Sequence, residues 1–366
     1  MNVYVAVAAL VPAAYQLLAI AACVKRMGFR QKLTGFTPPV SILKPVRGVD
    51  DAETFVRAIQ SQAAIDYPEY EILFGIRDES DPAVPFIRQL QTDNNRVRIV
   101  WTTTETLNGK VGSLIDLERA ARYDYLVISD ADIRVPRDYL TKVIAPLEDP
   151  SVGLTTCLYR AHGGSFVARL EGLGIETDFA PSALVAPSVG VDEFAFGSTI
   201  AVRRGDLARS GGLGPISDFI ADDYQIGRRI HDLGLKCVLA ETVVDTHLSG
   251  ATVAEVWRHQ VRWARTIRAS RPGGFMGLFV TFATFWAVLI GLAGEPWIAL
   301  GVLLVRMAAA GIASRGVLKS DGWRMLDLVP LRDLLGVGVW IAGLLPGSVE
   351  WRGRRMFLTS EGRIIP

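Results

Sequence analysis

Residues 123–135 read YDYLVISDADIRV and hold the two features that decide the fold. Positions 125–128 form a short apolar run with β-branched residues, which is typical of a strand buried on both faces of a parallel sheet. The run is followed at once by the polar tetrapeptide SDAD at 129–132. Ligands of open α/β sheets bind at the carboxyl ends of the strands. The stretch therefore predicts a buried strand that ends in a polar site.

The residues around this strand alternate between strand-like and helix-like patterns. Apolar runs with β-branched residues occur at 39–46, 69–78 and 96–103, and helix-like segments follow at 50–65, 81–93 and 109–122. Repeated βα units favour a mainly parallel, doubly wound sheet. We therefore expect an α/β domain over residues 39–251.

The start of the chain has the length and composition of a membrane anchor. Residues 3–24 carry no charge, and about 20 apolar residues suffice for a helix to cross the hydrocarbon core. No small-residue cleavage site follows, so we expect an uncleaved anchor over residues 1–24. The next segment, 25–38, is a basic linker, which by the positive-inside rule places the following domain in the cytosol.

Two later apolar runs, 274–294 and 297–313, predict a transmembrane hairpin over residues 273–313. The remaining segment, 314–366, is expected to be cytosolic. Its apolar stretch 334–346 is short for a span, and a further crossing would put the arginines at 352–355 outside, so a re-entrant or interfacial segment is favoured.

Bulk composition excludes some function classes. Half of the 366 residues are hydrophobic and the net charge is +1, so nothing indicates a nucleic-acid partner. The three cysteines have no paired spacing, which indicates neither a disulfide framework nor a zinc site and fits a reduced, cytosol-facing domain.

Several polar residues follow predicted strands or open predicted helices. Asp130 and Asp132 can both turn toward one hard cation, Mg²⁺ or Mn²⁺, although most such pairs in proteins are ordinary turns. Lys110 opens a helix where a phosphate could bind, but a plain turn explains it equally well. Lys44 and Pro45, at the end of the first strand, are equally ambiguous.

Asp222 and Asp223 lie at the start of a predicted helix. Acidic residues suit that position through capping and the helix dipole. A carboxylate there could also serve as a general base, provided that it reaches an acceptor hydroxyl.

The segment 259–270, HQVRWARTIRAS, lies in a helix predicted over 252–270. His259, Arg262 and Trp263 are spaced to share one face of that helix. A basic anchor at the membrane surface explains the arginines but not this alignment. We therefore expect an interfacial helix, with its connection, over residues 252–272.

In combination these residues resemble the membrane-bound family-2-like glycosyltransferases, and most closely the ceramide glucosyltransferase family. The likeness covers residues 39–270 and rests on Asp78, SDAD at 129–132, Asp223 in ADDY, and His259-x-x-Arg262-Trp263. It is carried by the segments SILKPVRGVDD, ILFGIRDESDPA, GKVGSLIDL, SDADIRV, GSTIAVRR and the run from ADDY to HQVRW.

The resemblance implies a glycosyltransferase A-type fold, a UDP-sugar donor, a divalent metal (Mn²⁺ or Mg²⁺) and inversion at the anomeric carbon. It implies that Lys44, Pro45, Asp78 and Lys110 bind the nucleotide sugar, with Asp78 at the uracil or ribose end. Asp130 and Asp132 would hold the metal and diphosphate, and Asp223 would deprotonate the acceptor hydroxyl. His259, Arg262 and Trp263 would close on the diphosphate and acceptor, which would be a membrane lipid.

Departures from the family pattern leave the acceptor open. The closing motif commonly begins with Gln or Arg, where this chain has His259. Animal ceramide enzymes lack the second aspartate that this chain keeps as Asp132, and their acceptor-region histidine has no clear counterpart in 176–190. Bacterial hopanoid-type glycosyltransferases, which move N-acetylglucosamine onto a hopanoid polyol, resemble the chain nearly as well.

Two other functions remain as alternatives. A processive polysaccharide synthase would have more spans and Gln at position 259. A non-catalytic nucleotide-sugar-binding membrane protein would not need the complete acidic set. The segment 164–187 is interpreted either as domain core or as an element on the acceptor side.

Overall fold

The computed structural model describes residues 3–248, 252–351 and 354–365, and the chain divides into two compact units. The sheet unit comprises Arg30–Tyr159 and Val191–His247. The helical unit comprises Met1–Phe29, Arg160–Gly190 and Leu248–Pro366. The domain expected over residues 39–251 is therefore divided, because Arg160–Gly190 packs with the helical unit.

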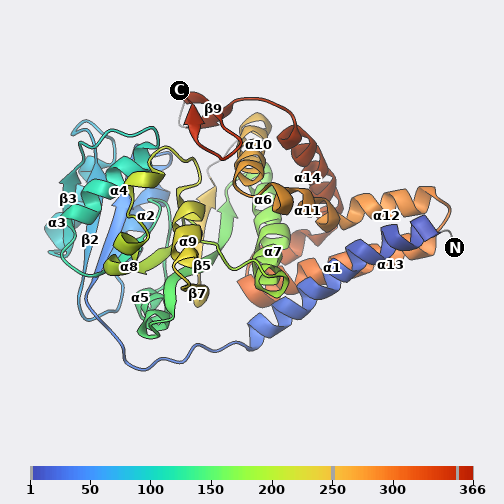
Figure 1. Cartoon of the computed structure of the whole chain (residues 1–366), viewed down its shortest axis with the longest axis horizontal. Coiled ribbons are helices and arrows are strands. Elements are labelled where there is room, and N and C mark those ends of the chain that lie inside the picture. The colour runs from blue at the N-terminus through green and yellow to red at the C-terminus, as the bar shows by residue number, and fades with distance from the viewer. Residues whose placement is uncertain (1–2, 249–251, 352–353, 366) are drawn as a thin grey trace. The chain divides into compact units, whose positions relative to one another are not determined.

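The sheet has seven strands in the order β3-β2-β1-β4-β6-β5-β7 (Figure 1). Their bounds are β1 Val40–Pro45, β2 Tyr70–Ile76, β3 Val97–Trp101, β4 Tyr125–Ile128, β5 Val152–Gly163, β6 Ile200–Arg203 and β7 Lys236–Leu248. Strands β1 to β4 are parallel, as predicted. The sheet as a whole is mixed, because β6 runs antiparallel to both β4 and β5.

Helices of the sheet unit follow the strands closely. They are α2 Ala52–Ala63, α3 Val84–Asp93, α4 Gly109–Ala120, α5 Tyr139–Ile144, α8 Arg204–Arg209 and α9 Asp222–Asp232, with the short helices η1 Ala145–Glu148 and η4 Gly214–Ile216. Polar side chains cap two of these helices, α2 and α4; at α2 the Asp51 carboxylate accepts the Thr54 amide at 2.8 Å.

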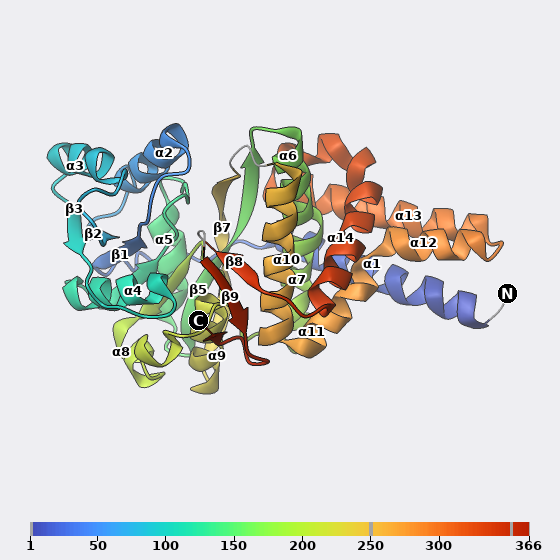
Figure 2. The same ribbon diagram turned by 90° about the horizontal axis from the view of Figure 1, so that it is seen from above.

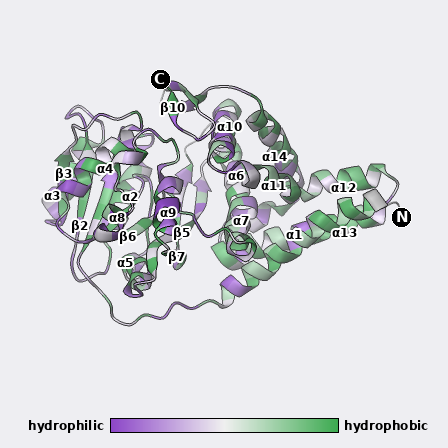
Figure 3. Cartoon of the chain, viewed as in Figure 1, coloured by the Kyte–Doolittle hydropathy of each residue, from purple (hydrophilic) through white to green (hydrophobic). Residues whose placement is uncertain are grey.

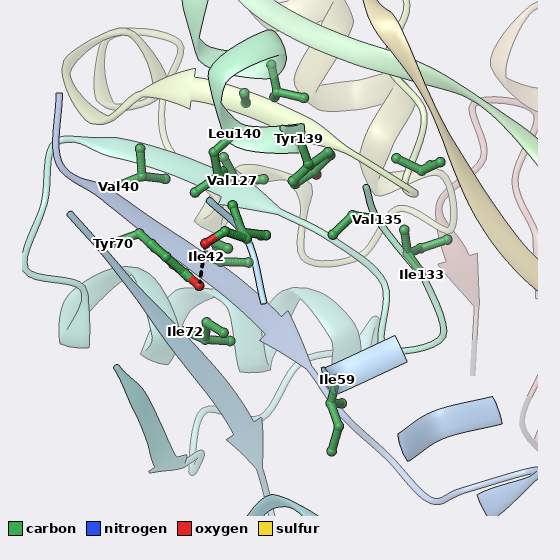
Figure 4. Packing of buried hydrophobic residues seen from close by; sticks show 14 of the residues in the cluster. Val40, Ile42, Ile59, Tyr70, Ile72, Val127, Ile133, Val135, Tyr139 and Leu140 are labelled. Atoms are coloured by element: carbon green, nitrogen blue, oxygen red, sulfur yellow. Dashed lines mark hydrogen bonds between the residues drawn. The ribbon is translucent and has the colours of Figure 1, made fainter. Parts of the chain in front are cut away.

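The central strands are buried on both faces, as expected for a doubly wound sheet. Alternate residues point to opposite sides, so Ile42 and Ile72 join one core cluster while Leu43 and Leu73 join the other. Figure 4 shows the first cluster, in which Val127 and Tyr139 also pack. This double burial fixes the register of β1, β2 and β4 and hence the position of their carboxyl ends.

The helical unit is mainly α-helical. Its first part holds α1 Val3–Gly28, α6 Phe166–Gly174, η2 Ile175–Phe179, α7 Ala180–Val185 and η3 Ala186–Val189. Its second part holds α10 Val253–Ser270, α11 Pro272–Gly277, η5 Leu278–Thr281, α12 Ala283–Leu292, α13 Pro296–Gly311, η6 Ile312–Leu318, η7 Asp321–Leu328 and α14 Val329–Leu344. The strands β8 Val349–Trp351, β9 Arg354–Leu358 and β10 Ile364–Ile365 form a small antiparallel sheet.

Two helical segments of the described chain, Val5–Gly28 and Pro296–Leu318, are long and apolar enough to cross a membrane. A third candidate is the pair Pro272–Thr281 and Ala283–Leu292, which is bent by 54°. Helices α1, α12 and α13 lie side by side in both ribbon views and are largely hydrophobic (Figures 1, 2 and 3). The first arm of the predicted hairpin is thus bent near Phe282, and the second extends beyond residue 313. Helix α14 has 16 residues, fewer than the about 20 that a span needs.

A buried ion cluster joins the elements of the helical unit. Arg306 of α13 is almost fully buried and pairs with Asp178 at 2.5 Å and with Asp333 at 2.7 Å. Thr284 donates its hydroxyl to Asp333 at 2.6 Å. The sequence pattern treated residues 297–313 only as an apolar run, so this cluster was not predicted.

Candidate active site

The candidate site begins at the carboxyl ends of β1 and β4. These strands are adjacent and parallel, with Leu43 opposite Ile128, so the residues that follow them emerge at one edge of the sheet. The Ser129 amide donates to the Leu43 carbonyl at 3.1 Å and extends the ladder by one residue. Lys44 and the SDAD segment are therefore neighbours because of the strand register.

Lys44 is fully buried at this edge. Its ammonium donates to the Asp130 main-chain oxygen at 2.7 Å and to the Ser129 hydroxyl at 3.3 Å. Burial lowers the pKa of Lys44 to about 8, against the opposing effect of Asp132 and Asp130. Lys44 thus fixes the backbone of the SDAD segment and places a positive charge behind its carboxylates.

Asp132 is held by β7. The Thr246 hydroxyl donates to the Asp132 carboxylate at 2.6 Å, and Arg134 forms an antiparallel bridge with Asp245 one residue before Thr246. Burial, and then the charge of Asp130, raises the pKa of Asp132. A bound cation would remove this penalty, because it would compensate both carboxylates.

Lys110 is positioned by the cap of α4. The buried Asn108 side chain accepts the amides of Lys110 and Val111 at 3.1 and 3.4 Å. It also donates to the Phe219 carbonyl at 2.8 Å, which ties this cap to the segment before α9. The predicted helix start at Lys110 is confirmed, and its side chain is turned into the carboxylate cluster.

The Lys110 ammonium lies 2.8 Å from Asp130 and 3.2 Å from Asp222. Burial would lower the pKa of Lys110, but the carboxylates of Asp130, Asp222 and Asp223 outweigh it and raise that pKa. Lys110 therefore stays charged and links the SDAD segment to the start of α9.

Asp223 is oriented by two backbone amides. Gly197 donates to one carboxylate oxygen at 3.0 Å and Tyr224 to the other at 2.8 Å. Burial, followed by the charge of Asp222, raises the pKa of Asp223 to about 6. A carboxylate with a pKa near 6 is ionised at neutral pH and is more basic than an ordinary aspartate, which suits a general base.

Gly197 lies among these charged groups. A Cβ at this position would come within 3.1 Å of the Asp130 carboxylate, 3.2 Å of the Lys110 ammonium and 3.6 Å of the Asp223 carboxylate. The backbone at Gly197 therefore comes so close to Asp130 and Lys110 that a side chain here would crowd both groups.

The residues present suit a divalent cation. Two lysines and four aspartates (Lys44, Lys110, Asp130, Asp132, Asp222 and Asp223) give a formal charge of −2 when all are ionised. Within the described chain, side-chain hydrogen bonds and ion pairs use one oxygen each of Asp130 and Asp132. No group of three or more His, Cys, Asp or Glu side chains suited to a metal is found among the described residues. A cation held there would therefore share its coordination with ligand oxygens.

The structure brings together five of the predicted site residues: Lys44, Lys110, Asp130, Asp132 and Asp223. Asp78 and Pro45 lie outside this cluster. Asp78 follows β2 in an exposed turn, where its carboxylate accepts the Ser80 amide at 2.8 Å. This hydrogen bond lowers the pKa of Asp78. Pro45 ends β1 opposite Gly75. Both lie at the carboxyl edge of the sheet, where a ligand larger than the cluster would extend.

The predicted closing motif lies in α10 of the helical unit. Thr252 and Glu255 form a capping box at the start of α10, as the sequence indicated for Thr252. His259 donates through Nδ1 to the carboxylate of buried Glu171 at 2.6 Å, and its ring lies 4.4 Å from the Trp263 ring. Gln260 donates to the same Glu171 oxygen at 3.0 Å. The expected alignment of His259 with Trp263 is confirmed.

Sequence reasoning missed several residues of these arrangements. Glu171 and Thr246 stand in ordinary amphipathic segments, and nothing in their spacing indicates a partner. Asp222 was interpreted only as an acidic residue that suits the start of a helix. Gly197 could have been noticed, because a glycine inside the shared segment GSTIAVRR indicates that the backbone must come close to other groups.

Comparisons with known proteins agree with the predicted family. Ceramide glucosyltransferase 1 of Caenorhabditis elegans is 22% identical over 353 residues, covering 89% of this chain and 73% of that protein. Ceramide glucosyltransferase 3 of the same organism is 22% identical over 359 residues, covering 93% of this chain and 77% of that protein.

Among solved structures, a mannosyltransferase of Pyrobaculum calidifontis in complex with GDP-Man and Mn²⁺ shares the fold. Its TM-score is 0.55 at 16% identity, covering 92% of this chain and 97% of that chain. The expected glycosyltransferase A-type fold is confirmed. The family model "Glycosyl transferase family 21" matches residues 3–364. The chain therefore belongs to glycosyl transferase family 21 and is a glycosyltransferase.

Proposed function

We propose that the protein is an inverting, metal-dependent glycosyltransferase that moves a sugar from a UDP-sugar, with glucose favoured, to the hydroxyl of a membrane lipid. The observation that carries this proposal is Asp223. It is a half-buried carboxylate with a pKa of about 6, held by two amides beside Lys110, in the same unit as the SDAD segment. A base and a cationic cluster at one site are what single displacement at an anomeric carbon needs.

Asp223 would accept the proton of the acceptor hydroxyl. The amides of Gly197 and Tyr224 fix the carboxylate in the orientation in which it would receive that proton. The gain from one positioned base is about 10²- to 10⁴-fold in rate. Displacement by one hydroxyl from the face opposite the leaving group inverts the anomeric centre.

The leaving UDP would be held at the SDAD segment. Asp130 and Asp132 would bind Mn²⁺ or Mg²⁺, which supplies positive charge to the departing diphosphate. Lys110 would add a further positive charge beside Asp130. Asp78, Lys44 and Pro45 lie at the same edge of the sheet, where we propose that the rest of the nucleotide sugar binds.

The acceptor side is assigned to the helical unit. We propose that His259, Arg262 and Trp263 close on the diphosphate and the acceptor. Glu171 would support this element by fixing the ring and the tautomer of His259. A lipid acceptor is supported by the candidate spans and by the relatives named for ceramide glucosylation.

We further propose that the chain is a multi-pass membrane protein whose sheet unit faces the cytosol. Lys25, Arg26, Arg30 and Lys32 directly follow the N-terminal candidate span, and positive residues are retained on the cytosolic side. A soluble UDP-sugar would then reach the site from the cytosol while the lipid hydroxyl reaches it from the bilayer.

The first experiment measures UDP release by the detergent-purified full chain with Mn²⁺ or Mg²⁺. UDP-glucose is offered with ceramide, and UDP-N-acetylglucosamine with a hopanoid polyol. Asp223→Asn should abolish release, whereas Asp232→Asn, an exposed aspartate at the other end of α9, should not. Release with only the second pair would assign the hopanoid acceptor instead. Full activity of Asp223→Asn would refute the assigned base.

A further inference from the structure

A pocket of about 420 Å³ lies in the helical unit, and none of the residues assigned above lines it. It is lined by Arg265 and Arg268 near the end of α10, by Pro272 at the start of α11, and by Gly347, Thr359 and Ser360 from the region of the small sheet. Two guanidinium groups and two hydroxyls in one pocket make a set of hydrogen-bond donors.

The two arginines lack anionic partners. Arg265 donates to the Ser348 carbonyl and Arg268 to the Leu344 carbonyl, each at 2.5 Å. In the part of the chain that the structure describes, no carboxylate forms an ion pair with either arginine. The buried Nε of Arg265 has no hydrogen-bond partner at all. A buried donor without a partner costs free energy unless a ligand satisfies it.

The other charged groups nearby do not neutralise the pocket. Arg355 of β9 donates to the Ser348 hydroxyl at 2.8 Å, on the same loop that Arg265 contacts. Glu350 and Glu361 lie nearest to other arginines, Arg258 and Arg363, at 3.9 and 3.6 Å. Consistent with this, burial and then the charge of Arg268 lower the pKa of Arg265. The pocket therefore keeps an uncompensated positive charge.

The position of the pocket along the chain indicates the source of its anion. Pro272 lines the pocket and also begins the bent apolar pair Pro272–Leu292, the third candidate for a membrane span. Arginine is the residue best suited to bind phosphate through two parallel hydrogen bonds. Basic pockets beside membrane helices bind the headgroups of anionic lipids.

We propose that this pocket binds the phosphate group of an anionic phospholipid and so fixes the end of α10 at the membrane surface. The shared ligand chemistry is a phosphate anion, and the bilayer is the source that the adjoining apolar segment favours. The site lies outside the residues proposed for catalysis, so the inference does not depend on which sugar or acceptor the enzyme uses.

The test uses the full chain in a neutral detergent and measures binding by the increase in thermal unfolding temperature and by native mass spectrometry. The probes are phosphatidylglycerol, phosphatidylcholine, inorganic phosphate and UDP. The double variant Arg265→Gln/Arg268→Gln should bind phosphatidylglycerol at least about tenfold more weakly than the wild-type protein does, because two charge-assisted contacts are lost. Arg258→Gln, an exposed arginine on the same helix, is the matched control and should bind as wild type.

A second variant avoids removing the arginines, whose bonds to backbone carbonyls also stabilise the loop. Ser360→Glu places a carboxylate in the exposed mouth of the pocket, where it should pair with the arginines and block the lipid without lowering stability. Equal binding of phosphatidylcholine, or unchanged binding by both pocket variants, would overturn the proposal. If inorganic phosphate binds and phosphatidylglycerol does not, the ligand is not a lipid. If UDP displaces the lipid, the pocket belongs to the binding site of the sugar donor.

Discussion

The two units bury charged clusters in opposite ways. In the sheet unit, Lys44 and Lys110 face four aspartates, so the cluster carries an excess of two negative charges when all are ionised. In the helical unit, Arg306 and Arg332 face Asp178 and Asp333, so the formal charges cancel. The sheet-unit cluster is only partly buried, with the Asp130 side chain 39% exposed, so a ligand could reach its excess charge. The helical cluster is balanced and needs no further partner.

The hydrogen bonds of Arg306 and Asp222 differ too, although the buried Nε of Arg332 in the helical cluster also has no hydrogen-bond partner. Arg306 uses its guanidinium fully, with bonds to both carboxylates and to the Thr177 carbonyl at 2.9 Å. In the sheet unit the Asp222 oxygen 3.2 Å from Lys110 makes no directed hydrogen bond, and Asp223 has a raised pKa. We infer that the balanced cluster holds helices together and that the unbalanced one is a site. The excess negative charge, which a cation or another ligand could compensate, carries this inference.

The largest expected effect is on the balanced cluster. Arg306→Met should lower the free energy of unfolding by about 3–5 kcal/mol, because it leaves the buried Asp333 without its cation and leaves Asp178 with the more distant Arg332. The measurement is thermal or denaturant unfolding of the purified protein in detergent. Replacing Asp333 by Leu in the same variant should recover part of the loss. A change of less than about 1 kcal/mol in the single variant would show that water, not Arg306, neutralises these carboxylates.

In the unbalanced cluster, removing a charge should impair binding and leave the fold intact. Asp132→Asn should weaken Mn²⁺ binding by at least about 10- to 100-fold, since it removes a proposed ligand. Stability should be unchanged or slightly higher, because repulsion from Asp130 is relieved. Manganese binding can be followed by electron paramagnetic resonance, with Asp138→Asn as the control: that exposed aspartate pairs with Lys142. Unaltered binding in Asp132→Asn would remove this residue from the metal site.

The sequence predicted most residues of the unbalanced cluster but none of the balanced one. Asp130 was proposed because it follows a buried strand at the edge where ligands bind, whereas Lys44, Lys110 and Asp223 were ambiguous by position and were assigned through the family resemblance. The four parallel strands and their helices were predicted because their apolar periodicity is local. The antiparallel strand β6 was not predicted, since its four residues carry no signal of direction.

The Arg306 cluster could not have been predicted. Its partners Asp178 and Asp333 are 128 and 27 residues away, and a single arginine inside an apolar run gives no sign of which carboxylate it will contact. The segment at 164–187 had been interpreted as either core or an acceptor-side element. Buried Glu171 and Glu176 lie there with partners in α10 and η6, so the segment packs inside the helical unit and not in the core of the sheet unit, and its role toward the acceptor stays a prediction.

The pH dependence of activity should report the unbalanced cluster. The pKa of Asp223 is raised to about 6, so the basic form is lost as the pH falls through 6. We therefore expect kcat/KM to be constant between neutral pH and about 6, and to fall about tenfold for each pH unit below 6. The contribution of Asp223 to folding stability should change in the opposite direction. It is fully present below pH 3.8, falls as the pH rises from 3.8 to about 6, and is level above 6, because the native state holds this proton more tightly than the unfolded state.

A matched variant tests this assignment. Asp222→Asn removes the nearest charge that raises the pKa of Asp223, so the acid limb should move to lower pH. The profile of a variant outside the cluster, Asp232→Asn, should match that of the wild type. An acid limb that stays in place in Asp222→Asn would mean that another group titrates there.

The smallest effect compares the helix caps of the two units. Asn108 is buried, caps α4 and also satisfies the Phe219 carbonyl, whereas Thr252 is exposed and caps α10 through its bonds with Glu255. Thr252→Ala should cost about 0.5–1 kcal/mol, the usual loss for an exposed cap. Asn108→Ala should cost about 2 kcal/mol, since a buried acceptor also loses its donor.

Activity separates the two caps further. Asn108 fixes the helix start that carries Lys110, so Asn108→Ala should lower kcat at saturating donor as well as stability. Asn108→Asp keeps the side-chain acceptor that caps α4 but removes the donor to the Phe219 carbonyl. This variant should therefore retain the cap and lose only the contact with Phe219. Asn108→Ala and Thr252→Ala could instead lower stability and kcat equally. That result would show that Asn108 stabilises only its own helix and that the carboxylates alone position Lys110.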